Sequence, residues 1–219
     1  MSRLISSFLS CLVLMSLSAC LPNAVKVACV GDSITFGHGL ADRNVESYPA
    51  QLAALLGDKF EVWNFGVNGR TVLKKGDFPF WNEVAYQESQ TFLPEIVLII
   101  LGTNDSKPQN WQHRAEFVAD YIALVEAYQR LPNQPDVYIG TPPPVYGQGS
   151  SISEDRLSEL RLGVRAVAQR TGATLVDLNG TCPFEPDYFP DGVHPDALGA
   201  KIMAECLAPV VQASSKARK

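Results

Sequence analysis

The feature that most constrains the fold is a fivefold alternation of short apolar runs with longer helical patterns. Runs rich in aliphatic and β-branched residues occupy 25–30, 60–65, 96–101, 137–141 and 174–178. Helical patterns lie at 48–56, within 82–92, and at 114–131, 152–170 and 195–211. Each apolar run has the length and composition of a strand that is buried on both faces. The alternation therefore predicts an α/β three-layer sandwich built on a five-stranded parallel sheet.

For five such strands we expect the flavodoxin-like order 2-1-3-4-5, in which ligands bind beyond the carboxyl ends of the strands. Candidate catalytic and binding residues do follow the strands: Ser33 follows the first, 66–70 the second and 102–105 the third. Two loops, 70–81 and 142–151, are longer than a minimal fold of this class requires. Long loops at this edge often carry substrate contacts, although solvent-exposed variation is the alternative for both.

Only three histidines could serve Ser33 as a general base. His38 lies between two glycines, and no carboxylate stands at a spacing that would orient it. His113 opens a helical pattern among charged residues, as a solvated or capping residue would. His194 follows Asp191 by three residues, so the carboxylate can reach the imidazole Nδ1 and leave Nε2 free for the serine proton.

Four sequence blocks together suggest a family. The blocks are Gly31-Asp32-Ser33, Asn64-Phe65-Gly66-Val67-Asn68-Gly69, Gly102-Thr103-Asn104-Asp105 and Asp191-Gly192-Val193-His194. In this order they resemble the conserved blocks of the SGNH (GDSL) hydrolases, and the Gly-x-Ser-x-Gly elbow of other α/β-hydrolases is absent from the sequence. The resemblance implies that Ser33 is the nucleophile, His194 the base and Asp191 its orienting partner. It also implies an oxyanion hole formed by the backbone N–H groups of Ser33 and Gly66 and the Asn104 side chain.

The chemistry of these residue types agrees with the resemblance. Hydrolysis of an ester places negative charge on the former carbonyl oxygen, and each preorganised donor contributes about 3 kcal/mol of transition-state stabilisation. Asp32 and Asp105 are expected to bond to nearby backbone N–H groups and to brace their loops, because aspartates favour turns and caps. We expect no metal and no cofactor, since no second histidine or cysteine stands at ligand spacing.

The loop after the second strand gives a first indication of the substrate. Residues 68–77, followed by Pro79-Phe80-Trp81, are similar to a bacterial subgroup of carbohydrate or sialate O-acetylesterases. Arg70 and Lys74 beside Trp81 would suit an anionic sugar, whose ring stacks while its carboxylate meets a cation. We therefore expect a small acyl group on a carbohydrate such as sialic acid. A lysophospholipase or acyl thioesterase of the same family is one alternative, and a noncatalytic carbohydrate-binding lipoprotein is a second.

The N-terminus indicates export. Arg3 precedes an apolar stretch that is short for a membrane span and ends in Leu17-Ser18-Ala19-Cys20, which resembles a bacterial lipobox. We expect residues 1–19 to be a lipoprotein signal peptide and Cys20 to carry a lipid anchor; a plain secreted protein is the alternative. Leu21 in place of aspartate favours the outer membrane by the usual sorting pattern, and the leaflet that faces the protein is left open.

The mature chain, residues 20–219, has the length of a single domain. Its formal charge is −6, because the loss of Arg3 lowers the value of −5 for the whole sequence. An acidic chain without a run of basic residues is not expected to bind nucleic acid. Cys29 lies in an apolar run and is expected to be a small core residue. Cys182 and Cys206 flank the His194 segment and either form a disulfide or remain two buried thiols.

Overall fold

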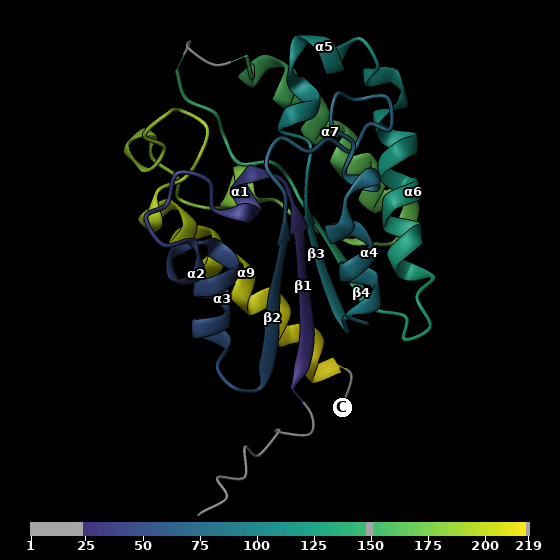
Figure 1. Ribbon diagram of the computed structural model, residues 1–219, viewed down its shortest axis with the longest axis vertical. Helices are drawn as coiled ribbons and strands as arrows, with labels where there is room; N and C mark the ends of the chain where they lie inside the picture. Colours follow the sequence, from purple (N-terminus) through teal and green to yellow (C-terminus); the bar gives the residue numbers. More distant parts are fainter. Residues whose placement is uncertain (1–23, 148–150, 218–219) are drawn as a thin grey trace, which may run out of the picture.

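A parallel sheet of five strands forms the centre of the molecule. The computed structural model describes residues 24–147 and 151–217. The sheet has the order β2-β1-β3-β4-β5 and every pairing is parallel (Figure 1). The strands are β1 (Val25–Gly31), β2 (Phe60–Gly66), β3 (Ile96–Ile100), β4 (Asp136–Gly140) and β5 (Thr174–Val176). The predicted strand order and fold class are confirmed.

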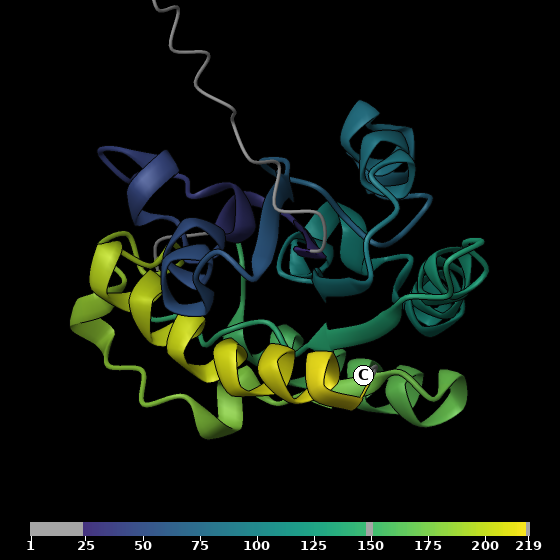
Figure 2. The same ribbon diagram turned by 90° about the horizontal axis from the view of Figure 1, so that it is seen from below.

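Five longer helices cover the two faces of this sheet. Helices α3 (Tyr48–Leu56) and α9 (Ala197–Ala217) pack on one face, whereas α4 (Val84–Thr91), α6 (Phe117–Gln129) and α7 (Glu154–Thr171) cover the other (Figures 1 and 2). Alternate residues of each strand enter opposite cores; in β1, Ala28 and Val30 point to the α6 side while Val27 and Cys29 point to the α9 side. Burial on both faces explains the apolar runs of β1, β3 and β4, whereas the edge strand β2 is partly exposed. The free thiol of Cys29 is fully buried, as expected of a core residue.

Several short elements connect the layers. They are α1 (Ser33–Phe36), α2 (Arg43–Glu46), α5 (Pro108–Trp111), α8 (Leu178–Thr181) and the 3₁₀ turns η1 (Phe80–Asn82), η2 (Asn104–Ser106), η3 (Arg114–Glu116) and η4 (Pro186–Tyr188). Most of them lie at or near the carboxyl edge of the sheet, where the candidate site residues are found. In the part of the chain that is described, no helix has the length and apolarity needed to span a bilayer. The expected signal peptide and Cys20 lie outside the described residues.

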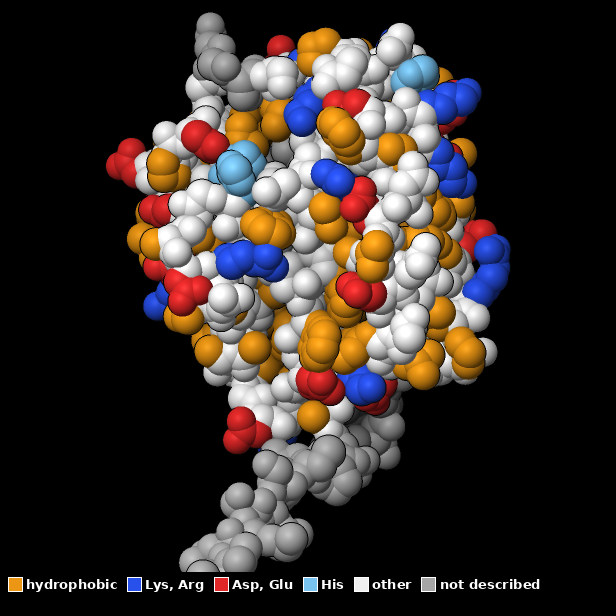
Figure 3. Space-filling model, in the orientation of Figure 1, with side chains coloured by type: hydrophobic (Ala, Val, Ile, Leu, Met, Phe, Trp, Pro, Cys, Tyr) orange, Lys and Arg blue, Asp and Glu red, His pale blue; other side chains and the backbone are white. Residues whose placement is uncertain are grey.

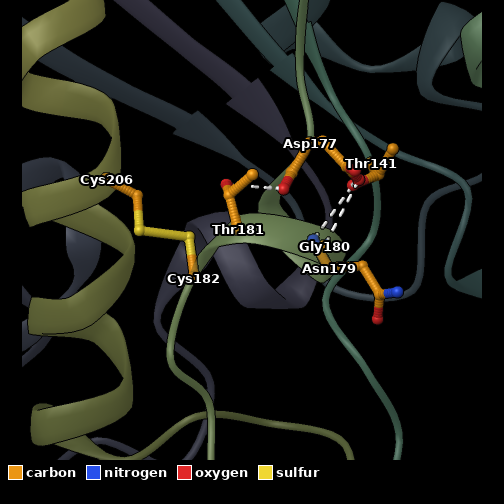
Figure 4. The surroundings of a disulfide bond; sticks show 7 residues. All are labelled: Thr141, Asp177, Asn179, Gly180, Thr181, Cys182 and Cys206. Atoms are coloured by element: carbon orange, nitrogen blue, oxygen red, sulfur yellow. Dashed lines mark hydrogen bonds between the residues drawn. A yellow bond between two sulfur atoms is a disulfide. The ribbon is translucent and has the colours of Figure 1, made fainter.

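A disulfide between Cys182 and Cys206 ties the segment after α8 to α9 (Figure 4). The Cα atoms of the two cysteines are 6.2 Å apart. Beside this bond, the Thr141 hydroxyl donates to Asp177 Oδ1 and accepts from the Asn179 N–H, both at 3.1 Å. The segment that contains Asp191 and His194 is thus fixed at both ends, by the disulfide and by the start of α9.

Candidate active site

Ser33 lies at the turn from β1 into α1. Asp32 caps α1 by accepting a hydrogen bond from the Ile34 N–H at 3.0 Å, which fixes the turn directly beside the serine. The Ser33 side chain is nearly buried, with 7% of the residue exposed. Its Oγ atom lies 2.8 Å from Nε2 of His194. The structure therefore places the expected nucleophile and base in hydrogen-bond contact.

Asp191 holds the opposite side of the His194 ring. The Asp191 Oδ2 atom lies 2.6 Å from His194 Nδ1, and Oδ1 accepts from the backbone N–H groups of Val193 at 2.9 Å and His194 at 2.7 Å. Partial desolvation would raise the pKa of Asp191, but the hydrogen bonds from the His194 side chain and from the two backbone N–H groups outweigh it and lower the pKa to about 2. An ionised carboxylate at this place fixes the tautomer that leaves Nε2 as a proton acceptor.

The other two histidines have different surroundings. The His38 ring lies beside that of His194, with 4.6 Å between the ring centroids, but His38 is exposed and has no carboxylate partner among the described residues. His113 precedes η3 and does not line the cavity at Ser33. The histidine in contact with Ser33 is thus His194, the one that the sequence predicts as the base.

The predicted oxyanion donors require one correction. The N–H of Gly66 donates to Asn64 Oδ1 at 2.9 Å, so it is not free for a substrate oxygen. Glycine is needed there for packing, because a Cβ atom would lie 2.2 Å from the backbone nitrogen of Phe36. The assignment of Gly66 to the oxyanion hole is wrong in this structure.

Gly69 occupies the place expected for that donor. It lines the same cavity as Ser33 and Asn104, and its φ of +80° turns the backbone there. Neither the Gly69 N–H nor the Ser33 N–H has an acceptor within the described residues. The Asn104 Nδ2 atom faces the same place and donates to Arg70 O at 3.1 Å and to Asp32 Oδ2 at 3.3 Å. The sequence signal that could have indicated Gly69 is the Asn68-Gly69 pair, since such pairs favour a left-handed turn.

Asp32 and Asp105 brace this edge, as expected from the sequence. Asp105 accepts from the N–H groups of Val72 at 3.1 Å and Leu73 at 2.8 Å, which fixes the loop after β2. Burial raises the pKa of Asp105 to about 7, although its backbone hydrogen bonds oppose the shift. Burial also raises the pKa of Asp32 to about 6, again against hydrogen bonds that favour the charged form. These two carboxyl groups support the site and do not face the cavity.

The three tentative substrate residues of the loop after β2 do not line the cavity at Ser33. Arg70 pairs with Glu83 at 2.7 Å, and the Lys74 ammonium lies 3.7 Å from Asp120 and over the Trp81 ring. The Trp81 Nε1 atom donates to Val72 O at 2.9 Å. These side chains hold the loop against η1 and α6. The sequence alone could not show which acids would pair with the two cations. Their role in substrate binding stays a prediction, since this structure places them outside the cavity at Ser33.

The cavity at Ser33 has a volume of about 290 Å³. Its lining residues are Ser33, His38, Asn68, Gly69, Asn104, Lys107, Ile152, Asp191, Val193 and His194. A second cavity of about 270 Å³ adjoins it across His38 and His194 and is lined in part by Leu40, Pro190 and Pro195. Across the described ranges, no group of three or more histidine, cysteine or acidic side chains is arranged to hold a metal ion.

Such a serine, activated by a histidine at the edge of a parallel sheet and without a nucleophile elbow, defines a serine hydrolase. The chain belongs to the GDSL-like lipase/acylhydrolase family, whose model matches residues 29–202. Lipases and acylhydrolases, after which this family is named, act on ester bonds. The matched range begins within β1 and ends in α9, so it includes all the residues of the candidate site.

Individual proteins similar to this chain include several esterases. The chain is 37% identical over 218 residues to an acetylxylan esterase from Xylanibacter ruminicola; the match covers 91% of this chain and 45% of the relative, so the chain spans just under half of its length. A carbohydrate acetylesterase from Sinorhizobium meliloti has a similar fold, with a TM-score of 0.72, 21% identity and coverage of 86% and 99%. An aryl esterase from M. smegmatis aligns with a TM-score of 0.71, 21% identity and coverage of 87% and 99%.

Proposed function

We propose that the protein removes acetyl groups from carbohydrates through a covalent intermediate on Ser33. The observation that carries the proposal is the series of two contacts, 2.8 Å from Ser33 Oγ to His194 Nε2 and 2.6 Å from His194 Nδ1 to Asp191 Oδ2. The similarity to an acetylxylan esterase supports the choice of an acetylated carbohydrate as the substrate.

In the first half of the reaction, Ser33 Oγ attacks the carbonyl carbon of the acetyl ester while His194 Nε2 takes its proton. The tetrahedral intermediate bears a negative charge on the former carbonyl oxygen. The bond to the sugar oxygen then breaks, and the sugar leaves with the proton that His194 returns. Acetyl-Ser33 remains. In the second half, water attacks this ester while His194 takes a proton from the water; the bond to Ser33 Oγ then breaks, His194 returns the proton to Oγ, and acetic acid leaves.

The negative charge of each intermediate would be bound by the Ser33 and Gly69 N–H groups and by the Asn104 amide. The two backbone donors have no acceptor within the described ranges, so a substrate oxygen gives up no existing bond of theirs. Asn104 would exchange or share one of its bonds to Arg70 O and Asp32 Oδ2, at 3.1 Å and 3.3 Å. Such preorganised donors are a main source of catalysis in acyl transfer.

A small acyl group fits the cavity better than a long chain does. Apart from Ile152 and Val193, the groups that line it are polar side chains and glycine backbone. A decanoyl chain needs a long apolar groove, and the apolar side chains of Leu40, Pro190 and Pro195 lie in the adjoining cavity, beyond His38 and His194. O-acetylated sialic acid and acetylated xylan are the two carbohydrate substrates that we place first.

A substrate panel tests this function. We expect the purified protein to cleave 4-nitrophenyl acetate faster than the decanoate, and to release acetate from acetylated xylo-oligosaccharides or O-acetylated sialic acid. A clear preference for decanoate or for lysophospholipids would replace the proposal with the lysophospholipase or thioesterase alternative. A fluorophosphonate probe should label the native chain and not the Ser33→Ala variant. Absence of labelling in both would favour a noncatalytic carbohydrate-binding protein.

We further propose that the enzyme is an exported lipoprotein, anchored through Cys20 and sorted to the outer membrane. The proposal rests on the N-terminal sequence, Arg3 followed by an apolar stretch that ends in Leu17-Ser18-Ala19-Cys20. Labelling of cells with radioactive palmitate should mark the native protein and not a Cys20→Ala variant. Equal secretion of both proteins without label would show a plain secreted enzyme.

A further inference from the structure

Lys107 differs from the cations of the loop after β2. Arg70, Lys74 and Lys75 each lie within 4 Å of a carboxylate, with Lys75 only 2.8 Å from Glu116. Lys107 lines the cavity at Ser33, and no acidic side chain of the described chain forms an ion pair with it. It is thus a cation that the protein leaves available beside the nucleophile.

The backbone of Lys107 is fixed on both sides. Its N–H donates to Asn104 O at 3.1 Å, and its carbonyl accepts from the N–H groups of Asn110 and Trp111 at 2.9 Å and 2.8 Å. The lysine therefore starts from a defined position three residues after the Asn104 amide. Its side chain alone is free to adjust to a ligand in the cavity.

The two acids on which the charge of Lys107 acts, Asp32 and Asp77, already have other partners. Asp32 is buried and accepts from Ile34 and Asn104, while Asp77 accepts from Gln109 and Asn110, each at 2.9 Å. The charge of Lys107 acts on both carboxyl groups through space, where it favours their ionised form, and no direct contact joins them. A carboxylate from outside the protein could therefore bind Lys107 without breaking an ion pair.

The site also limits where such a carboxylate can lie. Asp191 is more than half exposed, and Glu46 and Asp196 line the adjoining cavity on the other side of the histidine pair. A negative group on that side would meet Glu46 and Asp196, whereas a group on the Asn104 side would meet Lys107; Asp191 lines both cavities and favours neither side. Repulsion and attraction thus orient an acidic substrate in the same direction.

We propose that Lys107 binds a carboxylate of the sugar, so that the preferred substrate is an O-acetylated acidic carbohydrate whose carboxylate lies near the ester. This inference rests on the proposed carbohydrate esterase function. It names a cation for recognition of an acidic sugar that is different from those of the loop after β2. The lysine orients the ligand, whereas Ser33 and His194 carry out the reaction.

The main experiment compares two matched substrates, a methyl glucoside and the corresponding methyl glucuronoside, each with one acetyl group on the same hydroxyl. We expect the native enzyme to prefer the uronate by roughly tenfold in kcat/KM, as a charge-assisted contact in a partly exposed site would give. The preference should appear mainly in KM and decrease at high salt. Lys107→Gln should abolish it, and Lys107→Arg should retain most of it.

Lys75→Gln is the matched control, because it removes an equal charge whose ammonium is paired with Glu116. This variant should keep the uronate preference. Equal kcat/KM values for the two substrates in the native enzyme, or the same preference in Lys107→Gln, would overturn the proposal.

A second measurement keeps the two proposals distinguishable. Glucuronate should inhibit turnover of 4-nitrophenyl acetate by the native enzyme more strongly than glucose does, and Lys107→Gln should lose this difference. If the acetylated sugars are not cleaved but the inhibition difference is present, the carbohydrate esterase function fails and the role of Lys107 stands. If the sugars are cleaved but glucuronate and glucose inhibit equally, the role of Lys107 is wrong and the esterase function stands.

Discussion

The Ser33 Oγ and His194 Nε2 atoms lie 2.8 Å apart, although 161 residues separate them in the sequence. Ser33→Ala removes the nucleophile and leaves a cavity no larger than one oxygen atom. We expect kcat to fall by roughly 10⁴-fold or more, as in other serine hydrolases, with an unchanged thermal midpoint. Turnover of 4-nitrophenyl acetate and thermal unfolding measure the two effects. Substantial residual turnover would show that another group is the nucleophile.

Asp191 and His194 should differ in their importance. Asp191→Asn keeps an acceptor for the backbone N–H groups but weakens control of the imidazole tautomer, so its loss of kcat should be roughly a hundredfold smaller than that of His194→Ala. His38→Ala serves as the control, since His38 contacts the His194 ring and has no orienting acid. If His38→Ala lost as much activity as His194→Ala, the assignment of the base would have to change.

The two glycines after β2 should respond differently to alanine. At Gly66 the added Cβ would lie 2.2 Å from backbone atoms of α1, and such overpacking costs on the order of 1–3 kcal/mol or more. At Gly69 no atom lies within 4 Å, so only the positive φ opposes alanine, at about 1 kcal/mol. We expect Gly66→Ala to have the lower thermal midpoint. Gly69→Ala retains its N–H and should keep measurable activity.

The buried acids predict a dependence of stability on pH. The pKa values of Asp32 and Asp105, about 6 and about 7, lie above the ordinary aspartate value of 3.8. At pH values between 3.8 and these folded values, the folded state binds more protons than the unfolded state does. The free energy of unfolding should therefore fall as pH rises from about 4 to about 7 and then level off. Denaturant titrations at several pH values measure this slope, and Asp105→Asn should reduce it.

Asp191 has the opposite sign and acts in a different range. Its pKa is lowered to about 2, so the stability that it contributes is present above about pH 4 and is lost as pH falls through its folded value. Asp191→Asn should therefore leave the slope between pH 5 and 7 unchanged. Stability that rises over that range in the native chain would contradict the assignment of raised pKa values to Asp32 and Asp105.

The disulfide should stabilise the segment that contains the base. Cys182 and Cys206 are 24 residues apart, and closure of a loop of this size typically contributes about 2–4 kcal/mol. A double Cys182→Ala, Cys206→Ala variant should unfold at a lower temperature and be insensitive to dithiothreitol. The native chain should shift toward that temperature when reduced. An unchanged midpoint after complete reduction would show that the bond contributes nothing to stability.

The central strands β1, β3 and β4 could be predicted from the sequence because they are buried on both faces and read as apolar runs. All five expected strands are found within two residues of their observed bounds. The four-residue helices could not be predicted, since one turn has no periodicity. Helix α2, for example, depends on the Asp42 side chain, which caps it by accepting from the Asn44 N–H.

The site was predictable where function depends on side-chain type and not where it depends on backbone or pairing. Ser33, Asp191 and His194 are recognisable as residues, and the structure brings them together. The oxyanion donor was assigned to Gly66 and not to Gly69, because a backbone N–H has no distinctive side chain. The ion pair of Arg70 could not be foreseen for another reason: its partner Glu83 is recognised only when the loop is folded.

Helix α9 packs on the same face of the sheet as α3, the first long helix of the chain. It packs with α3, and the Gln51 side chain donates to Ala197 O at 2.8 Å, just after the segment that contains His194. The first strand and the first long helix can be made long before the base exists. Ester hydrolysis requires His194, which is added late in the chain. Recovery of turnover during refolding should therefore follow the docking of the last helix, α9, and not the formation of the sheet.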